Sequence, residues 1–228
     1  MSRKVTLLQL RDRARQRADA ENDSGWVSDA ELTSYVNESY TWVYELLVKS
    51  GESWFESTQT IATVSGTVTY DLPNDFYATI GVSRVDGSTL RSIPNFMAAE
   101  RNRYFNMQGG TPIAYRIVGQ SIELLPTAGG VHSIQHRYVP TPVNLAFDTD
   151  TLDGVMGWEE LVILNVAIKM GIKEESNVEP LVLAQQMFLD RLSEMVENRE
   201  LAESHTIFDV EEPDTIQSES SFFPWQRG

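Results

Sequence analysis

Three small groups of side chains could do chemistry, and the histidines come first. His132 and His136 are four residues apart, a spacing that would suit a shared zinc ion on a helix. The residues around them are β-formers, and on a strand the same spacing is roughly 13 Å at ~3.3 Å per residue, too far for one ion. The third histidine, His205, is remote in the sequence. The histidines therefore predict no zinc site.

Carboxylates make the other two groups. Residues 148–154 read Asp-Thr-Asp-Thr-Leu-Asp-Gly and resemble a calcium loop, but the third aspartate and the glycine come one position late and no glutamate closes the frame. Glu159 and Glu160 are adjacent, so on a helix they point in different directions and are better placed to offset the helix dipole. The sequence has no phosphate loop and no nucleophile elbow. We expect no metal, no cofactor and no enzymatic activity.

Composition narrows the function classes further. The chain of 228 residues has 33 acidic and 18 basic side chains, a formal charge of −15, and no cysteine. The lack of cysteine excludes zinc fingers, thiol catalysis and iron–sulfur clusters. A body this acidic is not expected to hold nucleic acid by neutralising phosphates. No run of 18 apolar residues occurs, so no membrane partner is expected.

The charge is unevenly distributed between the two ends. Residues 1–17 hold six cations and one anion, whereas residues 190–228 hold ten anions and three cations. Three interpretations of the basic end stay open: nucleic-acid binding, a solvated helix face, or contact with the acidic end of a neighbouring copy. Charge patterning of this kind mainly determines partner choice and encounter rate.

Four helices are predicted at the two ends of the chain. Thr6 with Gln9 forms a capping box before a helix over 7–21, and Ser28 with Glu31 forms another before a helix over 29–50. An almost wholly apolar segment over 157–171 predicts a buried helix. A last helix is expected over 178–203. Its predicted buried stripe consists of Leu181, Ala184, Met187, Phe188, Arg191, Leu192, Met195 and Val196.

Between the helices the period of the apolar residues changes to two, which predicts strands. The expected strands are 58–64, 67–70, 78–85, 89–93, 113–118, 121–125 and 133–139, with a short helix over 95–106. Ser65-Gly66 is expected to turn the second strand back along the first. The predicted fold class is α+β: a helical bundle of N- and C-terminal helices with an inserted small antiparallel β module and an extended C-terminal tail.

The order of several short motifs resembles that of the head-to-tail adaptor proteins of tailed bacteriophages. These are also called connector or head-completion proteins and include the tail tubular protein A of short-tailed phages. The motifs, which together span about 26–200, are Trp26-Val27 before Ser28–Leu32, Asn37 with Tyr40, Gly66–Phe76, Pro112–Ile117, Ile122–Pro126 and Tyr138–Pro142. Residues past 205 lie outside the resemblance.

The resemblance implies a structural virion protein rather than an enzyme. It implies a ring, usually of twelve copies, seated beneath the portal and surrounding the DNA exit channel. Residues 1–53 and 141–204 would be the helical ring-forming body, 54–140 the β-rich module, and 205–228 the extended tail. The partners would be the portal protein, a tail nozzle or tail tube protein, and other copies of the chain. DNA would pass through without specific binding.

The implied location is the head–tail junction of the virion, after assembly in the host cytoplasm. Three alternatives stay open: another tail-completion or stopper ring protein, a cytosolic interaction protein unrelated to phages, and an enzyme whose site goes unrecognised. A ring needs unlike complementary faces on each subunit, and the oppositely charged ends offer one such pair. Most of the charge of −15 is expected to face the channel.

Two sets of contact residues follow as hypotheses. Arg11, Arg13, Arg15 and Arg17 are expected to meet acidic surface on the adjacent subunit. In the tail, apolar side chains are expected to dock into a groove on the portal or on a neighbouring copy, since buried aromatic residues tend to dominate such interfaces. The docking residues would be Phe208, Phe222, Phe223, Pro224 and Trp225. The alternative is that the tail folds back on its own core.

Overall fold

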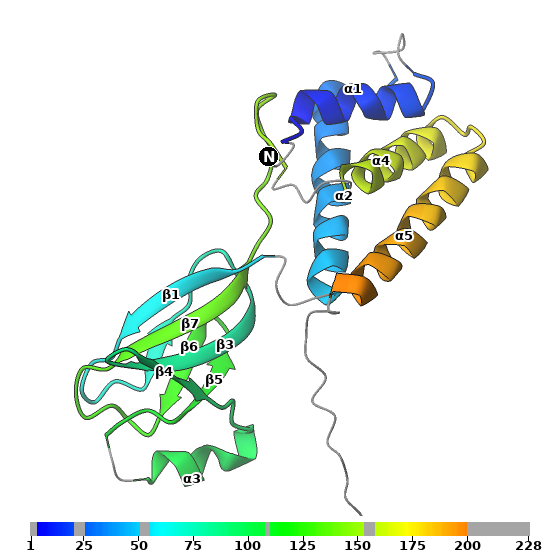
Figure 1. The fold of residues 1–228 in the computed structure, drawn as a ribbon. Helices are drawn as coiled ribbons and strands as arrows, with labels where there is room; N and C mark the ends of the chain where they lie inside the picture. Colours follow the sequence, from blue (N-terminus) through cyan, green and yellow to red (C-terminus); the bar gives the residue numbers. More distant parts are fainter. Residues whose placement is uncertain (1–3, 21–25, 51–54, 108–109, 153–157, 200–228) are drawn as a thin grey trace, which may run out of the picture.

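The computed structural model describes residues 4–20, 26–50, 55–107, 110–152 and 158–199 (Figure 1). The fold is α+β, as predicted: a body of helices and an inserted module of antiparallel strands. The helices are α1 (Leu7–Arg17), α2 (Asp29–Ser50), α3 (Arg101–Phe105), α4 (Glu159–Lys173) and α5 (Glu179–Arg199). The strands are β1 (Ser57–Ala62), β2 (Thr69–Asp71), β3 (Phe76–Asp86), β4 (Thr89–Ile93), β5 (Ala114–Val118), β6 (Ser121–Leu125) and β7 (Ser133–Pro140).

The two N-terminal helices begin where their capping residues predict. Thr6 Oγ1 accepts from the backbone N–H of Gln9 at 3.3 Å, and Gln9 Oε1 accepts from that of Thr6 at 3.2 Å, so the capping box is confirmed. α1 ends at Arg17, earlier than predicted, and Asp19 then takes a left-handed φ of 57°. α2 spans the predicted 29–50.

α4 is the centre of the helical body. It packs against α1, α2 and α5, and its side chains are buried nearly all round, as the apolar sequence predicts (Figure 1). A polar link crosses this core, where Ser39 of α2 donates to Asn165 of α4 at 2.8 Å. Lys169 and Lys173 of α4 pair with Glu38 and Glu31 of α2 at 2.9 and 2.6 Å. α2 and α4 are therefore joined by apolar packing and by charge.

The β module consists of two antiparallel sheets. One has the order β1-β7-β3-β4 and the other the order β2-β6-β5. Its main core contains buried side chains from both sheets, as expected for two sheets packed face to face. These are Ile61, Leu72, Val82, Ile93, Tyr115, Ile122, Leu124 and Ile134. A smaller cluster of Phe96, Ala114 and Leu125 lies beside α3 and is contacted by Tyr104.

Strand pairing differs from the sequence prediction at the first turn. β1 pairs with β7 and β2 pairs with β6, so Ser65-Gly66 connects two sheets and does not turn β2 back on β1. Gly66 has the positive φ of 82° that favours glycine, and its N–H donates to Ala128 O at 3.0 Å. A turn sequence reports a local change of direction, whereas the pairing partner is decided by which neighbour buries the apolar face of the strand.

The predicted short helix over 95–106 is also shorter in the structure. Asn95 forms a β-bridge with Tyr115, and Phe96 N–H donates to Tyr115 O at 3.0 Å. Helical structure begins at Ala98 and continues through α3. The start of this segment is therefore used to extend the edge of β5.

One end of the larger sheet joins the helical body. Val139 of β7 is buried in the helical core, and Ala78 and Ile80 of β3 pack against it. The Tyr44 hydroxyl of α2 donates to Pro140 O at 2.5 Å, and the Tyr44 ring stacks on Phe55 with centroids 4.2 Å apart. The module is thus attached through β3 and β7, while β4 and α3 lie at the far end (Figure 1).

Candidate functional site

Three of the four arginines on α1 form ion pairs with acidic residues of the same chain. We call Arg11, Arg13, Arg15 and Arg17 the arginine row. Arg11 pairs with Asp148 of the loop before α4, and its side chain is only 9% exposed. Arg15 pairs with Asp29 at 2.6 Å, and Arg17 pairs with Glu160 at 2.5 Å. The guanidinium of Arg15 lowers the pKa of Asp29. These pairs join α1 to α2, to the loop that precedes α4 and to the first turn of α4.

Arg13 differs from its three neighbours in the row. It is half-buried and makes no ion pair with another residue in the described part of the chain. Lys4, which is exposed just before α1, likewise makes none there. The contact of the arginine row with a neighbouring subunit stays a prediction. Among the four arginines, Arg13 is the one that forms no ion pair with a described residue.

α5 exposes three large apolar side chains among charged and polar ones. Leu183 and Met187 are 62% and 73% exposed, and Val182 is 45% exposed. The prediction that Met187 and Arg191 belong to the buried stripe is wrong, because both are exposed. The body covers Leu192 and half-covers Leu181, Ala184 and Phe188 instead. We call Val182, Leu183 and Met187 the α5 patch. The predicted stripe members Met195 and Val196 have side chains outside the described set.

A second exposed apolar surface lies at the start of α1. The N–H groups of Leu7 and Leu8 donate to Asp150 O at 2.8 Å and Asp148 O at 3.3 Å, which holds the loop against the first turn of the helix. The Asp150 carboxylate accepts from the N–H groups of Ala146 and Phe147 at 2.8 Å, and these bonds lower its pKa. Phe147 in this loop is 73% exposed, and Leu8 in the first turn of α1 is 43% exposed. We call Leu8 and Phe147 the loop patch.

Sequence reasoning missed both patches, although α5 carried a signal. Leu181, Val182 and Leu183 are three consecutive apolar residues, which cannot all lie on one face of a helix. No such signal marked Phe147, because a single aromatic residue in a loop is normal on a protein surface.

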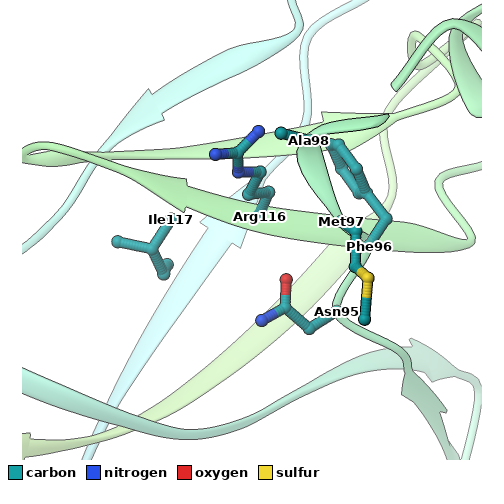
Figure 2. Close-up of a pocket in the computed structure, with 6 residues that line it drawn as sticks. All are labelled: Asn95, Phe96, Met97, Ala98, Arg116 and Ile117. Atoms are coloured by element: carbon teal, nitrogen blue, oxygen red, sulfur yellow. The ribbon is translucent and has the colours of Figure 1, made fainter. Parts of the chain in front are cut away.

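A pocket of about 420 Å³ lies at the edge of β5 in the β module (Figure 2). Arg116 and Ile117 line it from β5, and Asn95, Phe96, Met97 and Ala98 line it from the segment that leads into α3. Its lining offers one guanidinium, one amide and apolar surface, with neither a carboxylate nor a nucleophile. This pocket lacks the acid–base pair that hydrolytic or transfer chemistry needs.

Buried polar groups in the β module serve packing. His136 of β7 is fully buried, with its Nε2 3.1 Å from Thr79 Oγ1, and burial lowers its pKa to about 4. Its ring lies beside those of Phe76 and Tyr138. The Nε2 atom of His132 is 3.1 Å from Gly110 O. Within the described ranges, no group of three acidic or histidine side chains could hold a metal ion.

Two further sequence predictions concern the adjacent glutamates Glu159 and Glu160 and the apolar residues of the C-terminal tail. Glu159 and Glu160 lie in the first turn of α4, as predicted for residues that offset the helix dipole. The tail residues Phe208, Phe222, Phe223, Pro224 and Trp225 lie outside the described residues, so their docking stays a prediction. None of the described helices is both long and apolar enough to cross a membrane.

The fold is that of an α+β protein, with a helical body that exposes apolar side chains on α5 and on the loop before α4 and an inserted β module. The profile of the SU10 adaptor protein family matches residues 5–207, and the chain belongs to this family. It is therefore a phage adaptor-type structural protein and a virion component, and membership implies a non-enzymatic role. No curated protein matches the chain.

Proposed function

We propose that this chain is a head-to-tail adaptor that forms a ring beneath the portal, joins capsid to tail and surrounds the DNA exit channel. The observation that carries the proposal is the family match over residues 5–207, which includes the helical body and the whole β module. The ring would contain twelve copies. Above it the partner is the portal protein, and below it a tail nozzle or tail tube protein.

The shape and charge of the subunit support this proposal. The helical body is attached to the β module through β3 and β7, so the two can face different partners (Figure 1). A net charge of −15 suits a channel that repels DNA and keeps it mobile during ejection. The C-terminal tail would dock on the portal or on a neighbouring adaptor.

The test is assembly of the full chain on the portal protein of the same phage. Native mass measurement should show one portal ring carrying one adaptor ring of about twelve subunits, the number given by the family resemblance. Binding to an isolated tail component with no binding to portal would contradict the proposal and favour a tail-completion or stopper ring. A single adaptor copy on each portal would contradict the ring.

A second experiment tests the channel. The isolated protein should show no salt-sensitive binding to duplex DNA, because its net charge opposes the phosphate backbone. Fluorescence anisotropy of a labelled duplex, titrated at low and at physiological salt, measures this. Tight binding that weakens steeply with salt would contradict a DNA-repelling channel. It would favour the nucleic-acid interpretation of residues 1–17.

A further inference from the structure

We propose that the outer edge of β1 accepts residues 206–210 of the same chain as an added, parallel strand. These residues are Thr-Ile-Phe-Asp-Val, and we call them the tail strand. The sheet of order β1-β7-β3-β4 would then have the tail strand as a further member, beside β1. The inference does not rest on the proposed ring, because it concerns a contact within one chain.

The first observation is that β1 leaves a row of backbone groups without partners. β1 pairs with β7 alone, and in the same register the N–H of Thr63 donates to His132 O at 2.9 Å. Antiparallel strands alternate between bonded and non-bonded positions, so Thr58, Thr60 and Ala62 direct their N–H and C=O groups away from β7. All three residues are exposed, and these groups bond to no other described residue. Such a row is what an added strand binds in peptide recognition by sheet edges.

The second observation is that β1 lacks the features that protect the other sheet edges. Natural edge strands avoid unwanted pairing by being short, by carrying charge or by being covered. β2 has three residues, the side chain of Arg91 on β4 is 69% exposed, and the segment at Asn95 covers part of the edge of β5. β1 has six residues, Ser-Thr-Gln-Thr-Ile-Ala, with no charged residue and no proline. Among the described edges, β1 is therefore the one best suited to accept a strand.

The third observation is the end of the helical body from which the tail departs. α5 starts beside the end of α4, where Val178 lies against Gly171. Lys173 at this end of α4 pairs with Glu31 in the first turn of α2, so α5 and α2 start at the same end of the body. They are 21 and 22 residues long, and in Figure 1 both end at the end of the body that joins the β module.

The linking segments have matching lengths. Residues 51–56 separate α2 from β1, and residues 200–205 separate α5 from the tail strand. Six residues can span up to about 20 Å. The tail strand can therefore start level with β1 and run in the same direction, away from the helical body.

The fourth observation is the composition of the tail strand. Four of its five residues are Thr, Ile, Phe and Val, which favour strands, and it contains no proline. Pro213 and Pro224 interrupt the later parts of the tail. Under this inference Phe208 lies on its own β module, while Phe222, Phe223 and Trp225 are left for the portal or a neighbouring copy.

The distribution of charge favours the β module over the helical body as the place where the tail docks. Residues 200–228 hold seven acidic side chains and one basic side chain. Residues 1–53 and 141–199 together hold 20 acidic and 11 basic side chains, whereas residues 54–140 hold six of each. The body therefore repels the tail, and the module does not.

The first experiment measures amide hydrogen exchange in the full chain, in a chain truncated after Val210 and in a chain truncated after His205. The amide of Thr60 should exchange at least about tenfold faster in the chain truncated after His205 than in the other two, because an N–H bonded to an added strand is protected. The chain truncated after Val210 is the matched control, since it keeps the tail strand and lacks the aromatic end. The amides of Gln59 and Ile61, which face β7, should not change.

The second experiment uses engineered disulfides in the full chain, which has no native cysteine. Thr60→Cys is combined in turn with a cysteine at each position from 207 to 210, and each variant is oxidised at low protein concentration. Intramolecular bonds should form on one face of the tail strand only, because side chains of a strand alternate and a disulfide needs Cα atoms within about 7 Å. Leu90→Cys on β4 replaces Thr60→Cys in the matched control and should give no bond, although Leu90 is also exposed.

Each other outcome overturns the inference. Equal exchange at Thr60 in all three chains shows that the edge of β1 stays open. Fast exchange in the chain truncated after Val210 shows that a later part of the tail covers it. Equal bonding to Leu90→Cys shows that the tail has no fixed place, and linked dimers show that the tail strand is exchanged between copies. None of these results affects the proposed function, whose test is assembly on the portal.

Discussion

The side-chain amide of Asn37 is hydrogen-bonded to both backbone groups of Leu145. Leu145 N–H donates to Asn37 Oδ1 at 2.8 Å, and Asn37 Nδ2 donates to Leu145 O at 2.9 Å. One residue of α2 thereby fixes the loop that carries Phe147. Asparagine suits this role because its amide has a donor and an acceptor in one plane.

Replacing Asn37 should loosen this loop. Asn37→Ala leaves a partly buried N–H and C=O without partners, so we expect the free energy of unfolding to fall by about 1–3 kcal/mol. Chemical denaturation of the full chain measures the loss. Ser34→Ala on the exposed face of α2 is the control and should change stability by less than about 0.5 kcal/mol. Equal effects of the two substitutions would contradict a specific role for the amide.

His136 should make stability depend on pH. Its pKa is lowered by burial from 6.5 to about 4, so the unfolded chain binds more protons than the folded chain between these values. The stabilisation is complete above pH 6.5 and is lost as pH falls toward 4, by on the order of 3 kcal/mol in total. Denaturant titrations at half-unit pH steps measure the slope. His136→Gln should flatten it, and an unchanged slope in that variant would assign the effect to other groups.

Gly171 should tolerate no side chain while Val178 is present. A Cβ at Gly171 would lie 2.5 Å from Val178 Cγ1 and 2.9 Å from Ser176 Oγ, at the turn between α4 and α5. Overpacking of this kind costs about 1–3 kcal/mol, which outweighs the helix propensity that alanine gains. Gly171→Ala should therefore melt at lower temperature. The double variant Gly171→Ala/Val178→Ala should recover part of the loss, and no recovery would show that this overlap is not the cause.

Reversal of charge should separate Arg11 from Arg13. Arg11→Glu places a carboxylate at a position that is only 9% exposed and beside the exposed carboxylate of Asp148, so we expect the free energy of unfolding to fall by about 1–3 kcal/mol. Arg13→Glu should leave the free energy of unfolding within about 0.5 kcal/mol of the wild-type value. If the α1 side meets acidic surface on the neighbouring subunit, Arg13→Glu should also weaken assembly on portal more strongly at low salt. An effect of Arg13→Glu on melting alone would contradict a subunit contact.

Deletion of residues 218–228 tests the tail. If Phe222, Phe223 and Trp225 dock on the portal or on a neighbouring copy, the truncated chain should bind portal at least about tenfold more weakly with unchanged melting. Melting and portal affinity are measured on the same preparation. Lower melting with unchanged affinity would instead show that the tail folds back on its own body. Substituting the three aromatic residues by serine is the milder control for loss of chain length.

The amino-acid sequence by itself determined where most helices and strands lie. The capping box of Thr6 and Gln9, the unbroken helical period after Ser28 and the apolar run of α4 are local patterns, and each acts through residues within four positions. The glycines at 87 and 119 likewise mark turns whose positive φ the structure contains. Local patterns are enough here because helix caps and tight turns are made by neighbours in the chain.

Tertiary structure alone decided which surfaces are free. Arg11, Arg15 and Arg17 look alike in the sequence, yet their partners Asp148, Asp29 and Glu160 come from distant segments. The pairing of β1 with β7 and the exposure of Met187 depend in the same way on neighbours far along the chain. Burial and ion pairing are set by what packs against a side chain, and periodicity in one helix cannot report how wide a face the next helix covers.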